Sequence, residues 1–267
     1  MALPRSDRLF APLPPGSQPA SLAIARPRRT MSSMSSAVLL LTVVVAAAVT
    51  GTAQACNIPP DFWCDSYEIA QRCNVVAQCQ AFKADRRPIK ITLMYEALCP
   101  YCQRFITNQL GNLYNQFRHN VEIEMIPWGN SRLLRTGQIS CNHGQKECDA
   151  NRLMSCVIDV VKVKQAIPFI ICFERALSSQ PVDQAMHHCS TFIRNNYHEI
   201  KTCFQSERGV QLQRQAAHRT TTVRAHPIIE VPYIVINDYS PNLDGNNLNV
   251  SNLKDLIKKW ISYKIGR

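Results

Sequence analysis

The distribution of cysteine is the feature that most restricts what this chain can fold into. All 12 cysteines lie between Cys56 and Cys203, and none lies in residues 1–55. An even and dense set of cysteines is typical of proteins that fold in an oxidising compartment, where disulfides form and persist. We therefore expect a disulfide-stabilised protein and not a cytosolic enzyme.

The N-terminal 55 residues have the pattern of a signal peptide. Residues 37–50 form an apolar run that is too short to span a bilayer as a helix. Three arginines precede this run, and residues 53–55 match an A-x-A cleavage site. We expect cleavage before Cys56 and no stable membrane span in the mature chain. Translation from Met31 or Met34 and an uncleaved anchor are the alternatives.

The composition excludes two broad classes. Apolar residues make up 46% of the chain and charged residues 18%, which allows a sizeable core and excludes disorder of the whole chain. The net charge is +11, of which residues 56–267 carry +7. This is a mild basic bias without a Lys/Arg stripe interleaved with aromatic residues. We therefore expect no nucleic-acid partner.

Residues 56–85 form a small cysteine-rich segment ahead of a polar linker. They are too few to hold a core alone, so two disulfides are expected to stabilise them. The segment resembles a saposin A-type module at Cys56, Trp63-Cys64, Ala70, Cys73, Val76 and Cys79. The resemblance implies an endosomal or lysosomal setting. The alternative is an N-terminal extension of the next domain.

The sequence of residues 88–267 predicts an α/β domain. Apolar residues alternate over 89–95 and again over 121–125, as in strands, and they recur at helical spacing over 105–117. Strand, helix and strand within about 40 residues predict a βαβ unit with a parallel strand pair. The sequence favours a thioredoxin-like fold.

A helical, disulfide-stapled insert is expected at residues 130–219. It holds six cysteines, with short helical stretches such as 151–164 and 185–196. Residues 228–236 are rich in β-formers. Ser251 can cap a last helix, whose apolar face holds Leu253, Leu256, Ile257, Trp260 and Ile261. The lysines near the end of this helix are expected to be solvated.

Cys99 and Cys102 form a C-x-x-C pair between the first expected strand and the first expected helix, as in thioredoxin-like redox sites. Two intervening residues let both sulfurs reach disulfide distance within one helical turn. Pro100, followed by Tyr101, suits the first helical position, because its missing N–H costs nothing there. The helix N-terminus then favours a thiolate at Cys99.

These positions predict different roles for the two thiols. Cys99 is the expected nucleophile because it is N-terminal and more exposed, and Cys102 is the expected resolving thiol. One alternative is an inert disulfide. Another is a zinc site built from Cys141, His143 and Cys148 or from residues 187–189, but disulfides are the better interpretation in an oxidising lumen. We expect no metal and no cofactor besides the cysteine pair.

Val231-Pro232 is a second candidate element of the site. Cis peptide bonds are essentially confined to X-Pro, and proline at the head of a strand obeys the rules of sheet hydrogen bonding. In a thioredoxin-like fold a cis-proline loop lies against the C-x-x-C pair and binds the peptide substrate through its backbone. We expect a cis bond and substrate binding at Val231 and Pro232.

Residues 141–156 carry a longer motif. They resemble the hallmark C-Q-H-G-x2-E-C-x2-N-x4-C of the gamma-interferon-inducible lysosomal thiol reductase family. The matching residues are Cys141, His143, Gly144, Glu147, Cys148, Asn151 and Cys156. Asn142 departs from the family, which usually has glutamine there. The C-x-x-C pair lies about forty residues upstream, as in that family.

The resemblance implies a lysosomal or endosomal thiol reductase that reduces disulfides of partly unfolded proteins at acidic pH. It further implies a small thiol as electron donor and a role in proteolysis, antigen processing or host defence. The role of the 141–156 motif does not follow from first principles. Its cysteines are expected to staple the insert, and its histidine is expected to be either structural or a proton carrier.

Two other functions remain open at this stage: a secretory-pathway thiol oxidase or isomerase, and a non-catalytic binding module. No ER-retention tetrapeptide ends the chain, which disfavours an oxidase or isomerase that resides in the ER. Asn249 begins one glycosylation sequon, and secretion is the alternative to a lysosomal destination. The ten cysteines outside the C-x-x-C pair allow many connectivities, so no pairing is predicted.

Overall fold

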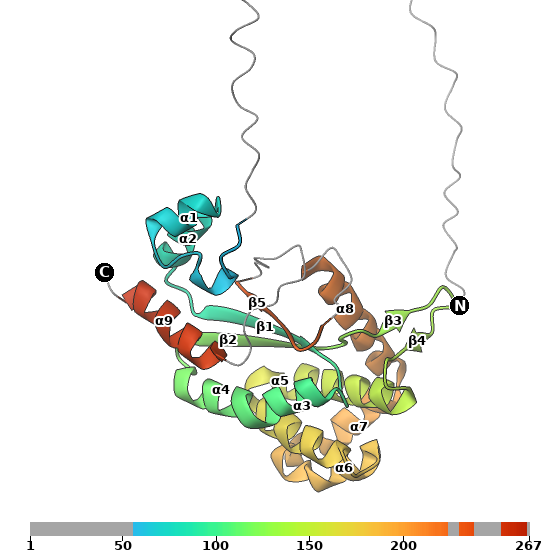
Figure 1. Ribbon diagram of the computed structural model, residues 1–267. Helices are drawn as coiled ribbons and strands as arrows, with labels where there is room; N and C mark the ends of the chain where they lie inside the picture. Colours follow the sequence, from blue (N-terminus) through green and yellow to red (C-terminus); the bar gives the residue numbers. More distant parts are fainter. Residues whose placement is uncertain (1–55, 224–229, 238–251, 266–267) are drawn as a thin grey trace, which may run out of the picture. The chain divides into compact units, whose positions relative to one another are not determined.

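The computed structural model describes residues 56–223, 230–237 and 252–265 (Figure 1). The predicted signal peptide, the sequon at Asn249 and the predicted cap at Ser251 lie outside the described residues. None of the described helices is both long enough and apolar enough to cross a membrane.

A three-stranded mixed sheet positions the site. Strand β1 (Ile89–Tyr95) lies in the centre, parallel to β2 (Val121–Pro127) and antiparallel to β5 (Tyr233–Ile236). Leu93 pairs with Met125 on one side and with Ile234 on the other. The two strands expected from alternation, and their parallel pairing, are confirmed. The β-rich stretch expected from residue 228 is a strand only from Tyr233 within the described residues.

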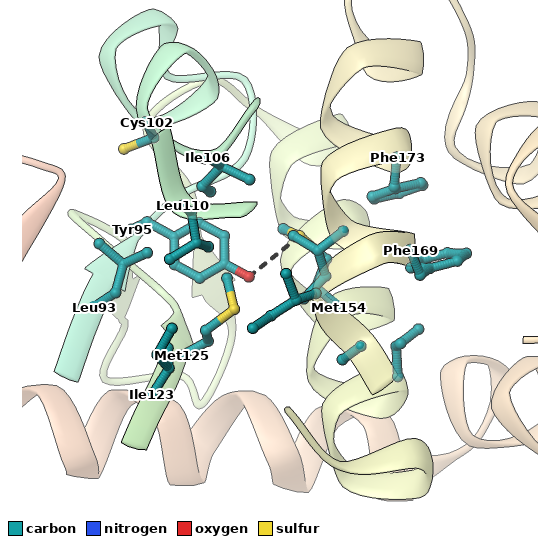
Figure 2. Packing of buried hydrophobic residues seen from close by; sticks show 14 of the residues in the cluster. Leu93, Tyr95, Cys102, Ile106, Leu110, Ile123, Met125, Met154, Phe169 and Phe173 are labelled. Carbon is teal, nitrogen blue, oxygen red and sulfur yellow. Dashed lines mark hydrogen bonds between the residues drawn. The ribbon is translucent and has the colours of Figure 1, made fainter. Parts of the chain in front are cut away.

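The helix after the C-x-x-C pair runs from β1 back to the start of β2. It comprises α3 (Pro100–Phe105), a π-helical turn (Ile106–Leu110) and α4 (Gly111–Phe117). Its buried side chains repeat at the predicted spacing. They pack on the face of β1 that carries Leu93 and Tyr95, where the Tyr95 hydroxyl donates to the Met154 sulfur at 3.4 Å (Figure 2).

Both faces of the sheet are covered, which explains why β1 is buried almost throughout. One face packs on α3, α4, α5 (Gln145–Leu177) and α9 (Leu253–Ile265). The other face, with Met94, Ile126 and Val235, packs on Ala216 of α8 (Glu207–Val223). The result is a helix–sheet–helix arrangement, consistent with the expected thioredoxin-like α/β fold.

The insert differs in detail from the prediction. It starts with a small hairpin, β3 (Arg132–Leu133) and β4 (Ile139–Ser140). The expected helix 151–164 is part of the 33-residue α5, which is kinked at Lys162, where φ is 64°. Helix α8 continues to Val223, past the expected end of the insert.

The expected helix 185–196 is wrong. Helix α6 (Val182–His188) ends at Cys189, and two 3-10 turns, Ser190–Phe192 and Arg194–Asn196, precede α7 (Tyr197–Gln205). Ser, Thr and Asn side chains crowd this stretch, and they compete with helical hydrogen bonding. Cys189 is also held to α5 by a disulfide.

Five disulfides use all ten cysteines outside the C-x-x-C pair. The pairs are Cys56–Cys73, Cys64–Cys79, Cys141–Cys148, Cys156–Cys203 and Cys172–Cys189. The first two close the N-terminal segment, as expected. The other three lie within the insert.

The N-terminal segment consists of a 3-10 turn (Pro60–Phe62), α1 (Tyr67–Arg72) and α2 (Val76–Ala84). It packs on α9, where the rings of Phe82 and Trp260 meet edge to face at 6.3 Å. Lys259 was expected to be solvated, but its ammonium group donates to the Asp61 carbonyl and pairs with Asp65 at 2.9 Å. The segment is therefore joined to the C-terminal helix by packing and by charge.

Candidate active site

The two free cysteines lie at the junction between β1 and α3. Cys99 is the N-cap of α3, and Pro100 occupies its first turn. Leu98, just before, has a φ of 65°, which turns the chain sharply out of the strand. The sequence-based expectation that Cys99 is the more exposed thiol holds only narrowly, because Cys99 is 6% exposed and Cys102 is 0% exposed.

The surroundings of Cys99 favour its thiolate. A hydrogen bond from the Cys102 thiol lowers the pKa of Cys99, and the backbone N–H groups of Cys102 and Tyr101 lower it further. Burial and the negative charge of Glu96 raise the pKa of Cys99, but by less. The pKa of Cys99 is therefore about 6, against an ordinary value of 9.0. The helix N-terminus thus acts on this sulfur as the sequence predicted.

The surroundings of Cys102 have the opposite effect. Burial raises the pKa of Cys102 far above its ordinary value, and the neighbouring Cys99 raises it further. One thiol is therefore prepared to ionise while the other keeps its proton. This asymmetry suits a nucleophile at Cys99 and a resolving thiol at Cys102.

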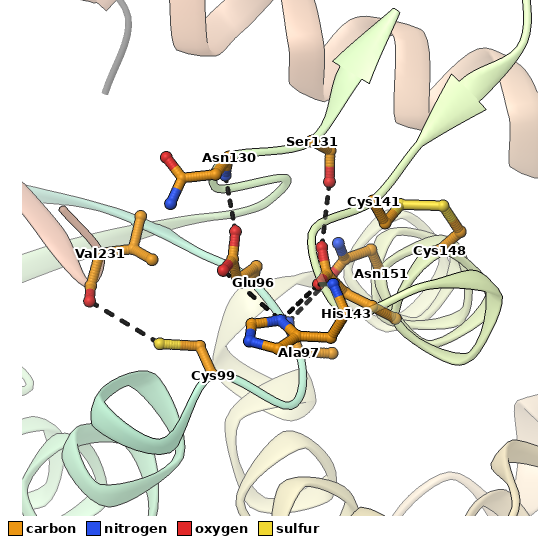
Figure 3. Close-up of polar contacts among 11 residues, drawn as sticks. Glu96, Ala97, Cys99, Asn130, Ser131, Cys141, His143, Cys148, Asn151 and Val231 are labelled. Carbon is orange, nitrogen blue, oxygen red and sulfur yellow. Dashed lines mark hydrogen bonds and ion pairs between the residues drawn. A yellow bond between two sulfur atoms is a disulfide. The ribbon is translucent and has the colours of Figure 1, made fainter. Parts of the chain in front are cut away.

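The Val231-Pro232 peptide bond is cis, as expected from the sequence. The Cys99 thiol points at the carbonyl oxygen of Val231, with 3.8 Å between sulfur and oxygen (Figure 3). Pro232 is buried, whereas Tyr101 is 69% exposed next to the nucleophile. A backbone carbonyl and an exposed aromatic ring therefore lie beside the reactive sulfur.

The 141–156 motif holds the loop that carries Cys99. Asn151, fully buried on α5, accepts a hydrogen bond from the Ala97 N–H at 2.9 Å. Gly144, with a φ of 80°, is the N-cap of α5, and the Cys141–Cys148 disulfide closes the turn around it. Sequence reasoning found these residues through the family motif but could not give them this role.

His143 lies between two buried carboxylates (Figure 3). Its Nδ1 is 2.6 Å from Glu147 and 3.6 Å from Glu96, and its side chain is 35% exposed. The backbone N–H of His143 and the Ser131 hydroxyl also donate to Glu147, at 2.7 Å and 3.2 Å.

Glu96 was missed by the sequence analysis. It is 1% exposed and accepts a hydrogen bond from the Asn130 N–H at 2.6 Å. Burial raises the pKa of Glu96, and Glu147 raises it further, while the Asn130 N–H and His143 lower it. One signal was available, because Glu96 is the acidic residue between a buried strand and the C-x-x-C pair.

Glu96, His143 and Glu147 bring three potential metal-ligand atoms within 4.8 Å of one another. However, Nδ1 of His143 is engaged by Glu147 at hydrogen-bond distance, and Glu147 accepts two further bonds. The imidazole nitrogen and both oxygens of Glu147 therefore already have hydrogen-bond partners. The zinc sites considered from the sequence require Cys141, Cys148 or Cys189, and all three are in disulfides.

Glu174 on α5 is a second titratable group missed by the sequence analysis. It is 1% exposed, and neither carboxyl oxygen has a well-formed hydrogen bond. Burial raises the pKa of Glu174 to about 8, and the charge of Cys99 adds to the effect. Glu174 is therefore protonated, and neutral, in acidic surroundings.

Comparison with known proteins gives two family matches. Residues 90–193 match the gamma interferon inducible lysosomal thiol reductase (GILT) family, and residues 52–83 match the saposin A-type domain. The first match spans all of β1 except its first residue, the C-x-x-C pair and the whole 141–156 motif. The second spans the four cysteines of the N-terminal segment.

Two individual relatives agree with the first match. The gamma-interferon-inducible lysosomal thiol reductase of Carassius auratus is 34% identical, over 68% of this chain and 72% of that protein. GILT-like protein 1 of Drosophila melanogaster is 29% identical, over 74% of this chain and 84% of that protein. A solved structure from Nitrosomonas europaea, proposed to be a protein disulfide isomerase, is 14% identical with a TM-score of 0.44, over 66% of this chain and 98% of that one.

Proposed function

The chain belongs to the gamma interferon inducible lysosomal thiol reductase family, and from that premise we propose that it reduces disulfides of partly unfolded proteins in an acidic endosomal or lysosomal lumen. It is a thiol-disulfide oxidoreductase. The observation that carries the proposal is the opposite environment of its two free thiols, with a low pKa at Cys99 and a high pKa at Cys102.

The reaction has two exchanges. The Cys99 thiolate attacks one sulfur of a substrate disulfide, and the other substrate sulfur leaves as a thiol after taking up a proton. Cys102 then gives up its proton and attacks Cys99 in the mixed disulfide. The second substrate thiol is released, and Cys99–Cys102 becomes the oxidised pair. A small-thiol donor, with two thiols per turnover, restores the reduced pair.

The pKa of Cys99 matters because the proposed compartment is acidic. At pH 5 a free thiol with a pKa of ~8.5 is only ~0.03% thiolate, whereas one with a pKa of ~6 is ~10% thiolate. Intrinsic nucleophilicity falls by roughly tenfold over the same change. The net gain in rate is therefore on the order of 20- to 30-fold.

The substrate contact is proposed at Val231 and Pro232. The Val231 carbonyl already lies against the Cys99 sulfur, so an extended peptide can pair with this backbone while its disulfide reaches the thiolate. Tyr101 offers an exposed ring to apolar side chains of an unfolded substrate. The signal-peptide pattern supports entry through the secretory pathway, and the roles in proteolysis, antigen processing or host defence follow from the family.

The test is reduction of a denatured, disulfide-bonded protein at pH 4.5–5 and at pH 7.4, with a small-thiol donor. We expect reduction at acidic pH, measured by non-reducing electrophoresis. We expect this reduction to be lost in Cys99→Ser. Activity confined to neutral pH would assign the protein to the oxidase or isomerase class. No Cys99-dependent activity at either pH would contradict the enzyme function.

A further inference from the structure

The strongest unexplained feature is the cluster of Glu96, His143 and Glu147 beside the active-site loop. Both carboxylates are buried, at 1% and 0% exposure, and one imidazole faces both, at 3.6 Å and 2.6 Å. Two buried carboxylates this close to each other are unfavourable unless a positive charge or a proton lies between them. His143 is the one basic side chain paired with either carboxylate among the described residues.

The cluster is connected to the nucleophile. Glu96 lies three residues before Cys99 on the same loop, and its negative charge opposes ionisation of the Cys99 thiol. Figure 3 shows the His143 ring joined to Glu96 by a dashed line, in the same part of the site as Cys99. Whatever neutralises Glu96 therefore makes the Cys99 thiolate easier to form.

We propose that protonated His143 neutralises Glu96 and Glu147 beside Cys99, and that this positive charge keeps Cys99 reactive in acidic surroundings. His143 is a positioning residue, because it acts on the sulfur through the charge of Glu96. This inference rests on the proposed reductase function and assigns the acid dependence of that function to one side chain. The effect needs the protonated form of the imidazole, so it belongs to acidic surroundings.

The other charged groups around the site do not replace His143. Glu174 faces Cys99 and Glu147, but its raised pKa, about 8, leaves it neutral at acidic pH. The Lys146 ammonium donates to the Leu177 carbonyl at the far end of α5. Asn130 and Ser131, which contact the two carboxylates from the loop after β2, are uncharged. Cys102 keeps its proton.

The test is the reactivity of Cys99 as a function of pH in His143→Gln. In the full-length protein expressed through a secretory host, with the C-x-x-C pair reduced, the rate of Cys99 alkylation by iodoacetamide reports the thiolate. If uncovering Glu96 raises the pKa of Cys99 from about 6 to ~7, the thiolate fraction at pH 5 falls about tenfold. Because the more basic thiolate is also the stronger nucleophile, by about threefold per pKa unit, we expect alkylation at pH 5 to be roughly three- to tenfold slower than in the wild type, and not slower at pH 9.

A second variant separates charge from structure. Glu96→Gln keeps an oxygen that accepts from the Asn130 N–H but removes the charge that His143 neutralises. Combined with His143→Gln, it is expected to restore at least half of the rate lost at pH 5. His198→Gln, at an exposed position on α7, is the matched control and should leave the profile unchanged. Thermal melting of each variant checks that it folds.

Three results would overturn the inference. One is an unchanged pH profile in His143→Gln. Another is a rate lowered by the same factor at every pH. The third is failure of Glu96→Gln to restore the rate in a double variant that melts like the wild type. Because alkylation needs no substrate disulfide, these results are distinct from a failure of the reductase assay, which would contradict the proposed function alone.

Discussion

Cys99 and Cys102 carry the same thiol group three positions apart, yet the structure gives them opposite environments. Their spacing and the helix that follows them can be read from the sequence, and so can the choice of Cys99 as nucleophile. The burial of Cys102 and the charge at Glu96 could not be predicted, because they depend on how α5 and the loop after β2 pack around the pair.

Also at the residue scale, replacing Asn151 tests whether the 141–156 motif holds the active-site loop. Asn151→Ala removes the acceptor for the Ala97 N–H and leaves that group buried and unpaired. We expect a loss of about 1–3 kcal/mol in the free energy of unfolding and a reductase activity lowered by about tenfold or more. Urea unfolding and the reduction assay measure the two effects.

The control for Asn151 is Asn112→Ala, at an exposed position on α4, which should change stability by less than about 0.5 kcal/mol. If Asn151→Ala behaves like this control in both measurements, the loop does not depend on the motif.

At the scale of elements, an ion pair fixes α8 to the sheet. Arg219 donates two hydrogen bonds to Glu124 of β2, each at 2.7 Å. Burial raises the pKa of Glu124, but hydrogen bonds from Arg219, Lys90 and Thr92 outweigh it and lower the pKa to about 2. Because the folded pKa lies below the ordinary 4.5, the stabilisation is complete above pH 4.5 and is lost as pH falls towards 2. The pair therefore survives at lysosomal pH.

Removing this ion pair should destabilise the protein measurably. Arg219→Gln is expected to cost about 1–3 kcal/mol in the free energy of unfolding at pH 5 and at pH 7, because Glu124 is left without its main partner. The matched control is Arg214→Gln on the same helix, whose partner Glu207 is well exposed, and it should cost less than ~0.5 kcal/mol. Equal costs in urea unfolding would show that α8 is held by packing alone.

The elements also show where sequence patterns stop being informative. Alternation located β1 and β2 because both strands are short and regular. In the insert, helical periodicity located only part of α5, which is buried over much of its circumference, and it wrongly continued a helix past the end of α6, where Cys189 is disulfide-bonded. A helix with contacts on several sides has no single apolar face for the sequence to display.

At the scale of the whole molecule, the disulfides differ in whether they contribute mainly to stability or mainly to activity. Cys156–Cys203 closes a loop of 47 residues, which corresponds to about 4 kcal/mol in the chain-entropy model. Cys141–Cys148 spans seven residues, worth about 2–3 kcal/mol, but it encloses His143. Their existence could be predicted from the cysteine count, whereas their pairing could not, since it depends on which helices meet.

Replacing each pair by alanine should separate the two effects. The Cys156→Ala/Cys203→Ala variant is expected to lose more stability in urea unfolding. The Cys141→Ala/Cys148→Ala variant is expected to lose more activity per folded molecule at pH 5. The opposite ranking in either measurement would contradict this division.

The measurement that tests the central claim most directly is the capture of a substrate on Cys99. A Cys102→Ser variant, incubated at pH 5 with a denatured, disulfide-bonded protein, cannot resolve the mixed disulfide. We predict that peptide mass spectrometry will find the substrate cysteine bonded to Cys99, with no adduct in the Cys99→Ser/Cys102→Ser double variant. An adduct at another cysteine, or none at pH 5, would contradict the claim that Cys99 is the nucleophile of an acid-active thiol reductase.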